Sequence, residues 1–408
     1  MIARSAPFLF FLTFLVLSFS LPVEAQTDST SQSSQETDWT DPEVQAFLQQ
    51  EGVGQTKQGL RGAETTFGLF GDVTYASKRG DVDKFSVGQL VLHGTADFGQ
   101  GFGSLIEVTL NSDPEWEARV ERMQMFWEHD DYLKFSFGRF HLPVTWWNST
   151  FHHGLWLQTT VRRPIMLGFD TAFIANHAIG LTAEGFIPGL EDYGLRYMVG
   201  VSGGDDDSHH IHDDGLVSDG HHDMNDMHGD EAGALDQKLQ SGPENHQIMP
   251  LAGIFYQPSS LPRLQMGVVA YTERYTWNDH HEVDYLALGA HIAYTSEQPE
   301  FILEYVDTVH DIEGFDQDYR TWSAYGQFAW RLCTSGIKSK FKPYARVERI
   351  DIEDKHPMFA DKATTDRYLG GLRIDLNPNL AIKLEYVHTD PEDMPTSRET
   401  LVQAVMTW

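Results

Sequence analysis

The sequence is poor in three features: it has one cysteine, few basic residues and almost no long apolar stretch. The single Cys333 excludes an intrachain disulfide, so the chain is not a disulfide scaffold. The 29 Lys and Arg residues stand against 60 Asp and Glu residues. The resulting net charge of −31 argues against nucleic-acid binding, which needs a basic face. Aromatic residues make up 12% of the 408 residues, too many for a disordered acidic chain.

The first 25 residues are typical of a secretory signal peptide. Arg4 supplies the basic start, residues 8–21 are almost wholly apolar, and Val23-Glu24-Ala25 is a small-x-small cleavage site. The apolar stretch is shorter than the ~20 residues that a spanning helix needs. No cysteine follows the cleavage site, so a lipid anchor there is not expected. Residues 26–62 are polar and are expected to form a periplasmic N-terminal segment without chemistry of its own.

From residue 63 onward the hydrophobic pattern has a period of two. Residues 86–98, 286–294 and 321–330 each place apolar side chains at alternate positions. This period predicts β-strands that have one apolar face and one wetter face. A soluble β-sandwich would show the same alternation, so the period alone predicts only an all-β chain.

Three features favour a transmembrane β-barrel over a sandwich. The alternating segments are close to the ~9–11 residues with which a tilted strand crosses a bilayer. Aromatic residues gather at the segment ends, as an interfacial girdle requires. Residues 400–408 form an alternating strand that ends on Trp408, which resembles the C-terminal signal of bacterial outer-membrane proteins. Because lipid offers no hydrogen bonds to an open edge, such strands must close on themselves.

We therefore expect an antiparallel barrel over residues 63–408 in the bacterial outer membrane. Short and long connections alternate, as in barrels whose tight turns are periplasmic. The long connections include 143–172, 204–247 and 313–320. The sixteen predicted strands are 63–77, 83–99, 101–113, 117–129, 132–142, 173–187, 195–203, 248–258, 261–274, 284–297, 300–312, 321–332, 341–354, 365–378, 379–391 and 399–408.

Short stretches of the sequence resemble bacterial porins of the phosphate-selective O/P type. The resemblance covers residues 63–408 in architecture, and it implies a 16-strand, trimeric, passive diffusion channel whose third outer loop folds inward. Anion selectivity is not carried over, because that family relies on arginine ladders and lysine clusters, whereas the basic residues here are few and interspersed with acids. The stretches are Gly138-Arg139-Phe140-His141-Leu142-Pro143, the loop that follows it to Pro164, and residues 370–379.

Alternation also predicts which charged residues face the interior. Acids and bases are nearly balanced among them, and opposed charges across a narrow lumen would order water and screen solutes. The alternative is that they only keep the lumen wet and pair with one another. The predicted lumen residues are Asp97, Glu107, Lys134, Arg331, Arg346, Glu348, Arg373, Asp375, Lys383 and Glu385.

Two further predictions concern single segments. Arg162 and Arg163, with His152 and His153, are the candidates for a constriction on the third outer loop; ordinary ion pairs within the loop are the alternative. Alternation does not determine which residues of the strand 117–129 face inward. Four polar residues of the strand cannot all point inward without a bulge: Arg119, Glu121, Arg122 and Gln124.

The most unusual segment is a loop rich in histidine and aspartate, residues 204–247. Imidazole and carboxylate ligands suit Zn²⁺, Ni²⁺ or Cu²⁺, and nearby methionines would suit Cu(I). The spacing is irregular, which favours weak divalent-metal capture over a structural zinc site. A solvated acidic loop, or one bridged to lipopolysaccharide by divalent ions, is the alternative. The candidate ligands are His209, His210, His212, His221, His222, His228 and Asp223.

The predicted function is a passive channel for small hydrophilic solutes or ions, biased toward cations, in a homotrimer embedded in outer-membrane lipid and lipopolysaccharide. The alternative is a surface metal-binding or adhesion barrel with a closed lumen. No nucleophile elbow is present, and although Ser149 lies near His152 and His153, we expect no enzyme and no resident cofactor.

The charge is unevenly distributed along the chain. Residues 205–236 contribute −11 and residues 26–60 contribute −5, about half of the total of −31. The predicted lumen is nearly neutral. A cation preference would therefore arise at an acidic outer mouth, and salt would screen it within about 10 Å at 0.1 M.

Overall fold

The computed structural model describes residues 57–58, 64–79, 83–111, 117–152, 155–168, 173–203, 239–240, 249–277, 281–334, 337–338 and 340–408, all within the unit Thr40–Trp408. The predicted signal peptide 1–25, His153 and all seven candidate metal ligands of the loop 204–247 lie outside these residues. Within the described part of the chain, no helix is both long enough and apolar enough to cross a bilayer.

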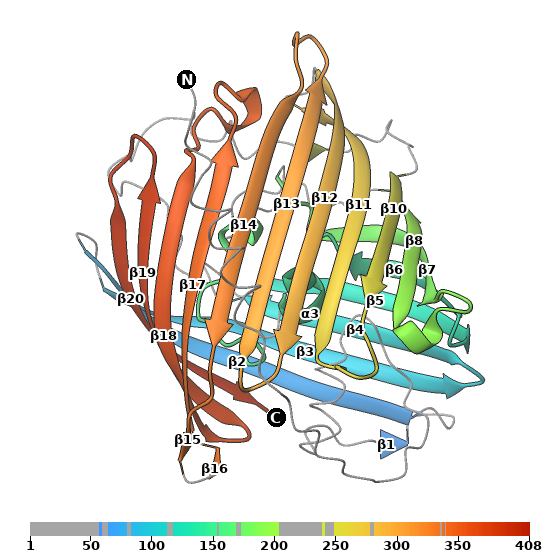
Figure 1. Cartoon of the computed structure of the whole chain (residues 1–408). Helices are drawn as coiled ribbons and strands as arrows, with labels where there is room; N and C mark the ends of the chain where they lie inside the picture. The colour runs from blue at the N-terminus through green and yellow to red at the C-terminus, as the bar shows by residue number, and fades with distance from the viewer. Residues whose placement is uncertain are drawn as a thin grey trace. The chain divides into compact units, whose positions relative to one another are not determined.

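Sixteen long antiparallel strands form one closed barrel in the described part of the chain (Figure 1). Each strand pairs with the next one along the chain, and the last pairs with the first, from Lys78↔Glu399 to Phe70↔Thr407. The strands are β2 (Glu64–Lys78), β3 (Lys84–Gly99), β4 (Phe102–Asn111), β5 (Glu117–Asp130), β6 (Leu133–His141), β7 (His177–Phe186), β8 (Leu195–Ser202), β10 (Met249–Tyr256), β11 (Leu264–Trp277), β12 (His281–Thr295), β13 (Glu300–Ile312), β14 (Tyr319–Ala329), β17 (Phe341–Ile352), β18 (Thr365–Asn377), β19 (Leu380–Pro391) and β20 (Ser397–Thr407).

The predicted antiparallel all-β barrel and all sixteen of its predicted strands are confirmed, with strand ends that differ by at most four residues. Tight turns join the strands at one end of the barrel, for example at residues 100–101, 131–132 and 378–379. The largest difference is at β7, which begins at His177 instead of residue 173. The remaining short elements are β1 (Lys57–Gln58), β9 (Leu239–Gln240), β15 (Cys333–Thr334), β16 (Ile337–Lys338), α3 (Trp146–Phe151), η2 (Ile165–Leu167), η3 (Glu191–Tyr193) and η6 (Pro357–Phe359).

The bulge that the sequence requires in the fourth strand is present. The register between β4 and β5 shifts after Glu107, which pairs with Arg122, so that Glu121 is the extra residue. Both Glu121 and Arg122 are buried as a result.

A second irregularity follows on β6 at Gly138. Its φ is 133°, and its Cα lies so close to the Met123 carbonyl that a Cβ would be 2.0 Å from that oxygen. Only glycine fits there without strain.

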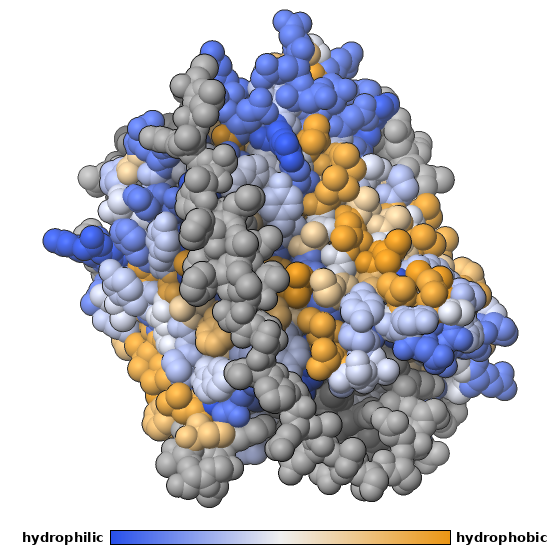
Figure 2. All heavy atoms as spheres, in the orientation of Figure 1, coloured by the Kyte–Doolittle hydropathy of each residue, from blue (hydrophilic) through white to orange (hydrophobic). Residues whose placement is uncertain are grey.

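The outer surface of the barrel is apolar over its middle. Figure 2 shows apolar side chains across the lower and central parts of one face, below a hydrophilic upper end. Exposed aromatic residues border the turn end, among them Phe98, Phe102, Trp330 and Trp408. Each of the sixteen long strands contributes at least one large, exposed apolar side chain: Phe67, Leu92, Ile106, Met123, Phe137, Leu181, Val199, Ile254, Val268, Leu288, Tyr305, Phe328, Val347, Tyr368, Leu384 and Val402.

The opposite face of the wall is buried and carries most of the charged side chains. The segment 142–168, which includes α3 and η2, packs against this face. Leu155 and Trp156 join Phe70 and Val91 in one apolar cluster. Val161 lies in a second cluster with Tyr344 and residues of neighbouring strands. Through these two clusters the segment packs with residues of β2, β3, β14, β17, β18, β19 and β20.

Gly289 of β12 permits a close approach of this segment to the wall. A Cβ on Gly289 would lie 1.8 Å from the carbonyl oxygen of Val144, and its neighbour on the same face, Ala287, is fully buried. Small side chains on β12 therefore make room for the backbone of the segment.

A Gly289→Val substitution should push residues 142–168 away from β12. Overpacking of this kind typically costs about 1–3 kcal/mol, so the free energy of unfolding in urea should fall by that amount. Ala290→Val, one residue further on and on the outward face, should change it by less than about 0.5 kcal/mol. Equal effects of the two substitutions would contradict the close approach.

Candidate functional site

Glutamates of the wall accept hydrogen bonds from backbone amides of the segment 142–168. The Glu304 carboxylate accepts from the amides of Trp146 (2.6 Å) and Trp147 (3.0 Å), at the start of α3. The Glu385 carboxylate accepts from Val161 (2.8 Å) and Arg162 (2.9 Å). Because a helix N-terminus and an irregular loop both leave amides without backbone partners, these carboxylates complete their hydrogen bonding.

Cationic side chains of the wall perform the complementary role for backbone carbonyls. Arg346 donates to the carbonyls of Arg162 (2.8 Å) and Arg163 (2.7 Å). Arg373 donates to the carbonyls of Trp156 (2.7 Å) and Gln158 (3.0 Å). Lys383, whose side chain is fully buried, donates to the carbonyls of Leu155 and Thr160.

These contacts involve several of the residues that alternation predicts for the lumen. Arg346, Glu348, Arg373, Lys383 and Glu385 do lie on the buried face. Each of these residues is at most 8% exposed and is bonded to the backbone of the segment 142–168, and its role in a lumen stays a prediction. The balance of acids and bases on this half of the wall is explained by the two kinds of backbone group that it binds, amides and carbonyls.

The two arginines of the loop are held in place as well. The Arg162 guanidinium pairs with Glu399 of β20, and the Arg163 guanidinium donates to the carbonyl of His152 (2.9 Å) and stacks over Trp147. Each residue is 6% exposed. The Arg162 pair thus joins the loop to the wall and is not an ion pair within the loop, and a role of either arginine in a constriction stays a prediction.

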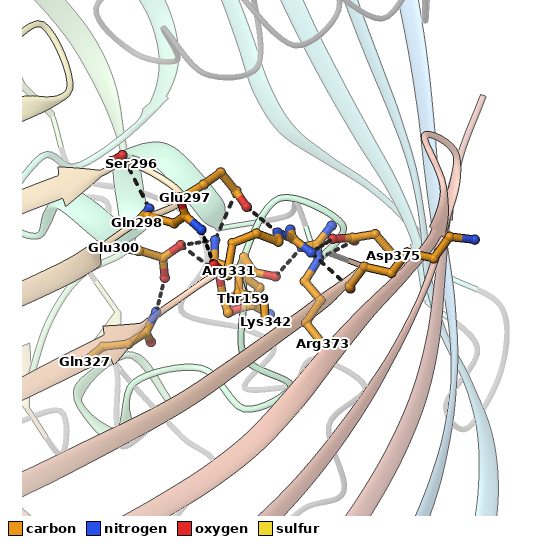
Figure 3. A network of polar contacts seen from close by, with 12 residues as sticks. Thr159, Ser296, Glu297, Gln298, Glu300, Gln327, Arg331, Lys342, Arg373 and Asp375 are labelled. Atoms are coloured by element: carbon orange, nitrogen blue, oxygen red, sulfur yellow. Dashed lines mark hydrogen bonds and ion pairs between the residues drawn. The ribbon is translucent and has the colours of Figure 1, made fainter. Parts of the chain in front are cut away.

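A second network lies at the turn end of the same half of the barrel (Figure 3). Lys342 contacts Glu297 (3.2 Å) and Glu300 (2.6 Å), and Arg331 bridges Glu297 and Asp375. Burial raises the pKa of Glu297, but Lys342 and Arg331 outweigh it and lower that pKa to about 2. The network also reaches the loop, because Thr159 donates to Glu300 (2.8 Å).

The other predicted lumen residues lie elsewhere on the wall. Glu107 pairs with Arg122 (2.7 Å), and Lys134 pairs with Glu184 (3.7 Å). Asp97 is exposed near the turn end, where its carboxylate accepts from the amide of Gly99. It therefore lies at the rim and not deep inside.

Among the charged residues of these networks that sequence reasoning missed, three are buried on strands of the same half of the wall. Glu300, Lys342 and Glu399 are buried and bonded as described above. Each lies an even number of positions from another buried polar residue on its own strand, respectively Glu304, Arg346 and Gln403, so alternation could have found them. What alternation could not supply was their partners in the segment 142–168.

Comparisons with known proteins bear on the fold. No protein-family model and no curated protein matches the sequence. Among solved structures, the anion-selective porin from Comamonas acidovorans superposes with a TM-score of 0.57 at 11% identity, over 85% of this chain and 100% of that one. The outer membrane channel DcaP of Acinetobacter baumannii gives 0.57 at 11% identity, over 86% and 99%. OmpT of Vibrio cholerae, in a trimer form, gives 0.52 at 9% identity, over 85% and 99%. The chain therefore has the 16-strand barrel fold of outer-membrane porins.

Replacement of Glu385 by alanine should release the loop from the wall. The change leaves the amides of Val161 and Arg162 buried without this acceptor, which costs about 1–3 kcal/mol per group. A loss of about 2 kcal/mol raises the population of an opened loop about 30-fold. Trypsin should then cleave after Arg162 at a correspondingly higher rate, measured by mass spectrometry on the folded barrel.

The matched control is Glu313→Ala, which removes an exposed carboxylate at the loop end of β13. It should leave the cleavage rate unchanged. If Glu385→Ala cleaves no faster than this control, the glutamate does not hold the loop.

The low pKa of Glu297 predicts how its contribution to stability depends on pH. The folded-state value of about 2 is below the ordinary value of 4.5, so the ion pairs stabilise the barrel fully above about pH 4.5 and lose this effect as the pH falls toward about 2. Unfolding in urea should show a constant difference between the unmodified chain and Glu297→Gln from pH 7 to about 5. The difference should then shrink down to pH 3; a difference that grows on acidification would contradict the assignment.

Proposed function

We propose that this protein is a passive channel of the bacterial outer membrane for small hydrophilic solutes or ions. The observation that carries the proposal is the division of the closed 16-strand wall into an apolar outer face on every strand and a charged inner face. A bilayer requires the apolar outer face, and an aqueous path requires the charged inner face. The porin fold that the solved structures share supports the same conclusion.

The orientation in the membrane follows from the connections. In bacterial barrels the tight turns are periplasmic and the longer loops extracellular. The N-terminal end of β2 and the C-terminal Trp408 would then lie on the periplasmic side, where exposed aromatic residues border the apolar band. The segment 142–168 is the third connection at the extracellular end, and we propose that it folds inward and narrows the path.

The remaining finer predictions are part of the proposal. The acidic residues of 205–236 would enrich cations at the outer mouth, and the histidines there would capture divalent metal ions weakly. A homotrimer in outer-membrane lipid is proposed because OmpT of Vibrio cholerae has a trimer form. The resemblance to phosphate-selective porins rests on residues 138–143, 143–164 and 370–379 alone, without their anion selectivity.

A closed barrel with a binding role at the surface is the second candidate function. It is favoured by the dense packing between loop and wall, where Asn148, Val161 and Lys383 have no exposed side-chain area. In that case the segment 142–168 would plug the interior instead of narrowing it.

Conductance across a planar bilayer distinguishes the two candidates. A channel should give discrete conductance steps, and in a salt gradient the reversal potential should indicate a cation-to-anion permeability ratio above one. Deletion of residues 205–236 should keep the steps and remove the cation preference, because it removes a charge of −11. Absence of steps from the folded chain would favour the closed barrel, and a ratio below one would overturn the cation bias.

A further inference from the structure

Three buried histidines meet where the segment 142–168 leaves and rejoins the wall. His141 is the last residue of β6, His177 is the first residue of β7, and the two are register partners. His152 follows α3 as its C-terminal cap. The ring centroids are 4.8 Å (His141–His152), 5.0 Å (His141–His177) and 5.0 Å (His152–His177) apart, so the rings form a nearly equilateral triangle.

The donor nitrogens of this triangle are close enough to share a metal ion. One ring nitrogen from each residue lies within 4.8 Å of the other two. A tetrahedral zinc ion with Zn–N bonds of ~2.0–2.1 Å places its nitrogens about 3.3 Å apart. The rings are tilted or edge-on to one another and not stacked, so small side-chain rotations would bring the nitrogens to that spacing.

The backbone around the triangle is fixed by hydrogen bonds that hold its three corners together. The Asn148 side chain in α3 donates to the carbonyls of Leu142 (3.0 Å) and Asn176 (2.8 Å), the residues next to His141 and His177. The Leu142 amide donates to the carbonyl of Asn176 (2.9 Å). Together with the bond from Arg163 to the His152 carbonyl, these contacts preorganise a site built from two strands and a helix.

Two carboxylates border the triangle. Glu107 Oε1 lies 3.8 Å from His141 Nε2, and Glu121 Oε2 lies 3.4 Å from His177 Nε2. The nitrogen of a metal-bound histidine that does not bind the metal usually donates to a carboxylate, which orients the ring and increases its basicity. The two negative charges would also compensate a buried divalent cation. The bulge in β5 is what turns Glu121 toward this site, next to Arg122.

We propose that His141, His152 and His177 bind one divalent transition-metal ion, with Zn²⁺ as the reference ion, and that Glu107 and Glu121 orient the ligands. Three imidazoles leave a fourth position for water or a carboxylate oxygen. The bound ion would join α3 to β6 and β7 and so fasten the loop to the wall on the side opposite Glu385. This site is distinct from the histidine-rich loop 204–247.

The test uses the full-length folded barrel in detergent, in a background where His209, His210, His212, His221, His222 and His228 are all replaced by Gln. Isothermal titration with Zn²⁺ should show one equivalent bound, and Co²⁺ should give the intense visible absorption of tetrahedral coordination. His152→Gln or His177→Gln should lower the Zn²⁺ affinity by more than about 100-fold. Glu121→Gln, beside the ligands, should lower it by about 10–100-fold.

The matched control is His291→Gln, which replaces a buried histidine of β12 outside the triangle. It should leave Zn²⁺ affinity unchanged, and its circular dichroism and heat-modifiable mobility set the standard for correct folding. The proposal fails if the chain with the six loop histidines replaced binds no Zn²⁺, or if its Co²⁺ absorption is the weak spectrum of octahedral coordination. This outcome is measured on a chain whose triangle is intact, so it does not depend on how a triangle variant folds. It also fails if folded His152→Gln and His177→Gln chains keep the affinity. Because Zn²⁺ binding is measured without conductance, the test of the metal site is independent of the test of the channel function.

Discussion

The structure depends on one constraint, that every backbone amide and carbonyl of the wall finds a partner within the sheet. The ladder between β20 and β2 meets this constraint by closing the barrel, and the end bonds between Leu69 and Trp408 complete it. An open edge would leave polar groups against lipid without partners. Once the sheet is closed, alternation places large apolar groups on the outer face of all sixteen strands and the buried charged groups on the inner face.

The same constraint explains what the inward charges do. In the described part of the segment 142–168 the helical pieces are short, and amides and carbonyls outside them bond to side chains of the wall. Wall glutamates accept from the amides, and wall arginines and lysine donate to the carbonyls. The buried charges of the wall are tolerated because they have hydrogen-bond partners. Both acidic and basic side chains are needed because the loop backbone offers both N–H donors and carbonyl acceptors. Acids and bases are therefore paired through the loop as well as with one another.

How far prediction from sequence reached differs between the wall and the loop. The period of two located all sixteen strands, and the conflict between Glu121 and Arg122 indicated the bulge, because both are local properties of a strand. Which residues of a strand face the interior was likewise predictable, because side chains alternate between the two faces along the strand. The contacts of Lys383, Glu304 and Glu385 were not, since they depend on where a loop more than 130 residues away in the sequence passes across the wall.

The sequence by itself determined the closed all-β wall, its apolar outer face and the uneven charge along the chain, since each follows from residue type at alternating positions or from simple counting. Only the tertiary structure decided which interior charges hold the loop and which remain at the rim, as Asp97 does. It alone also brought His141, His152 and His177 into one triangle. The physical reason is that strand geometry repeats every two residues, whereas the path of an irregular loop is set by long-range contacts that no local period encodes.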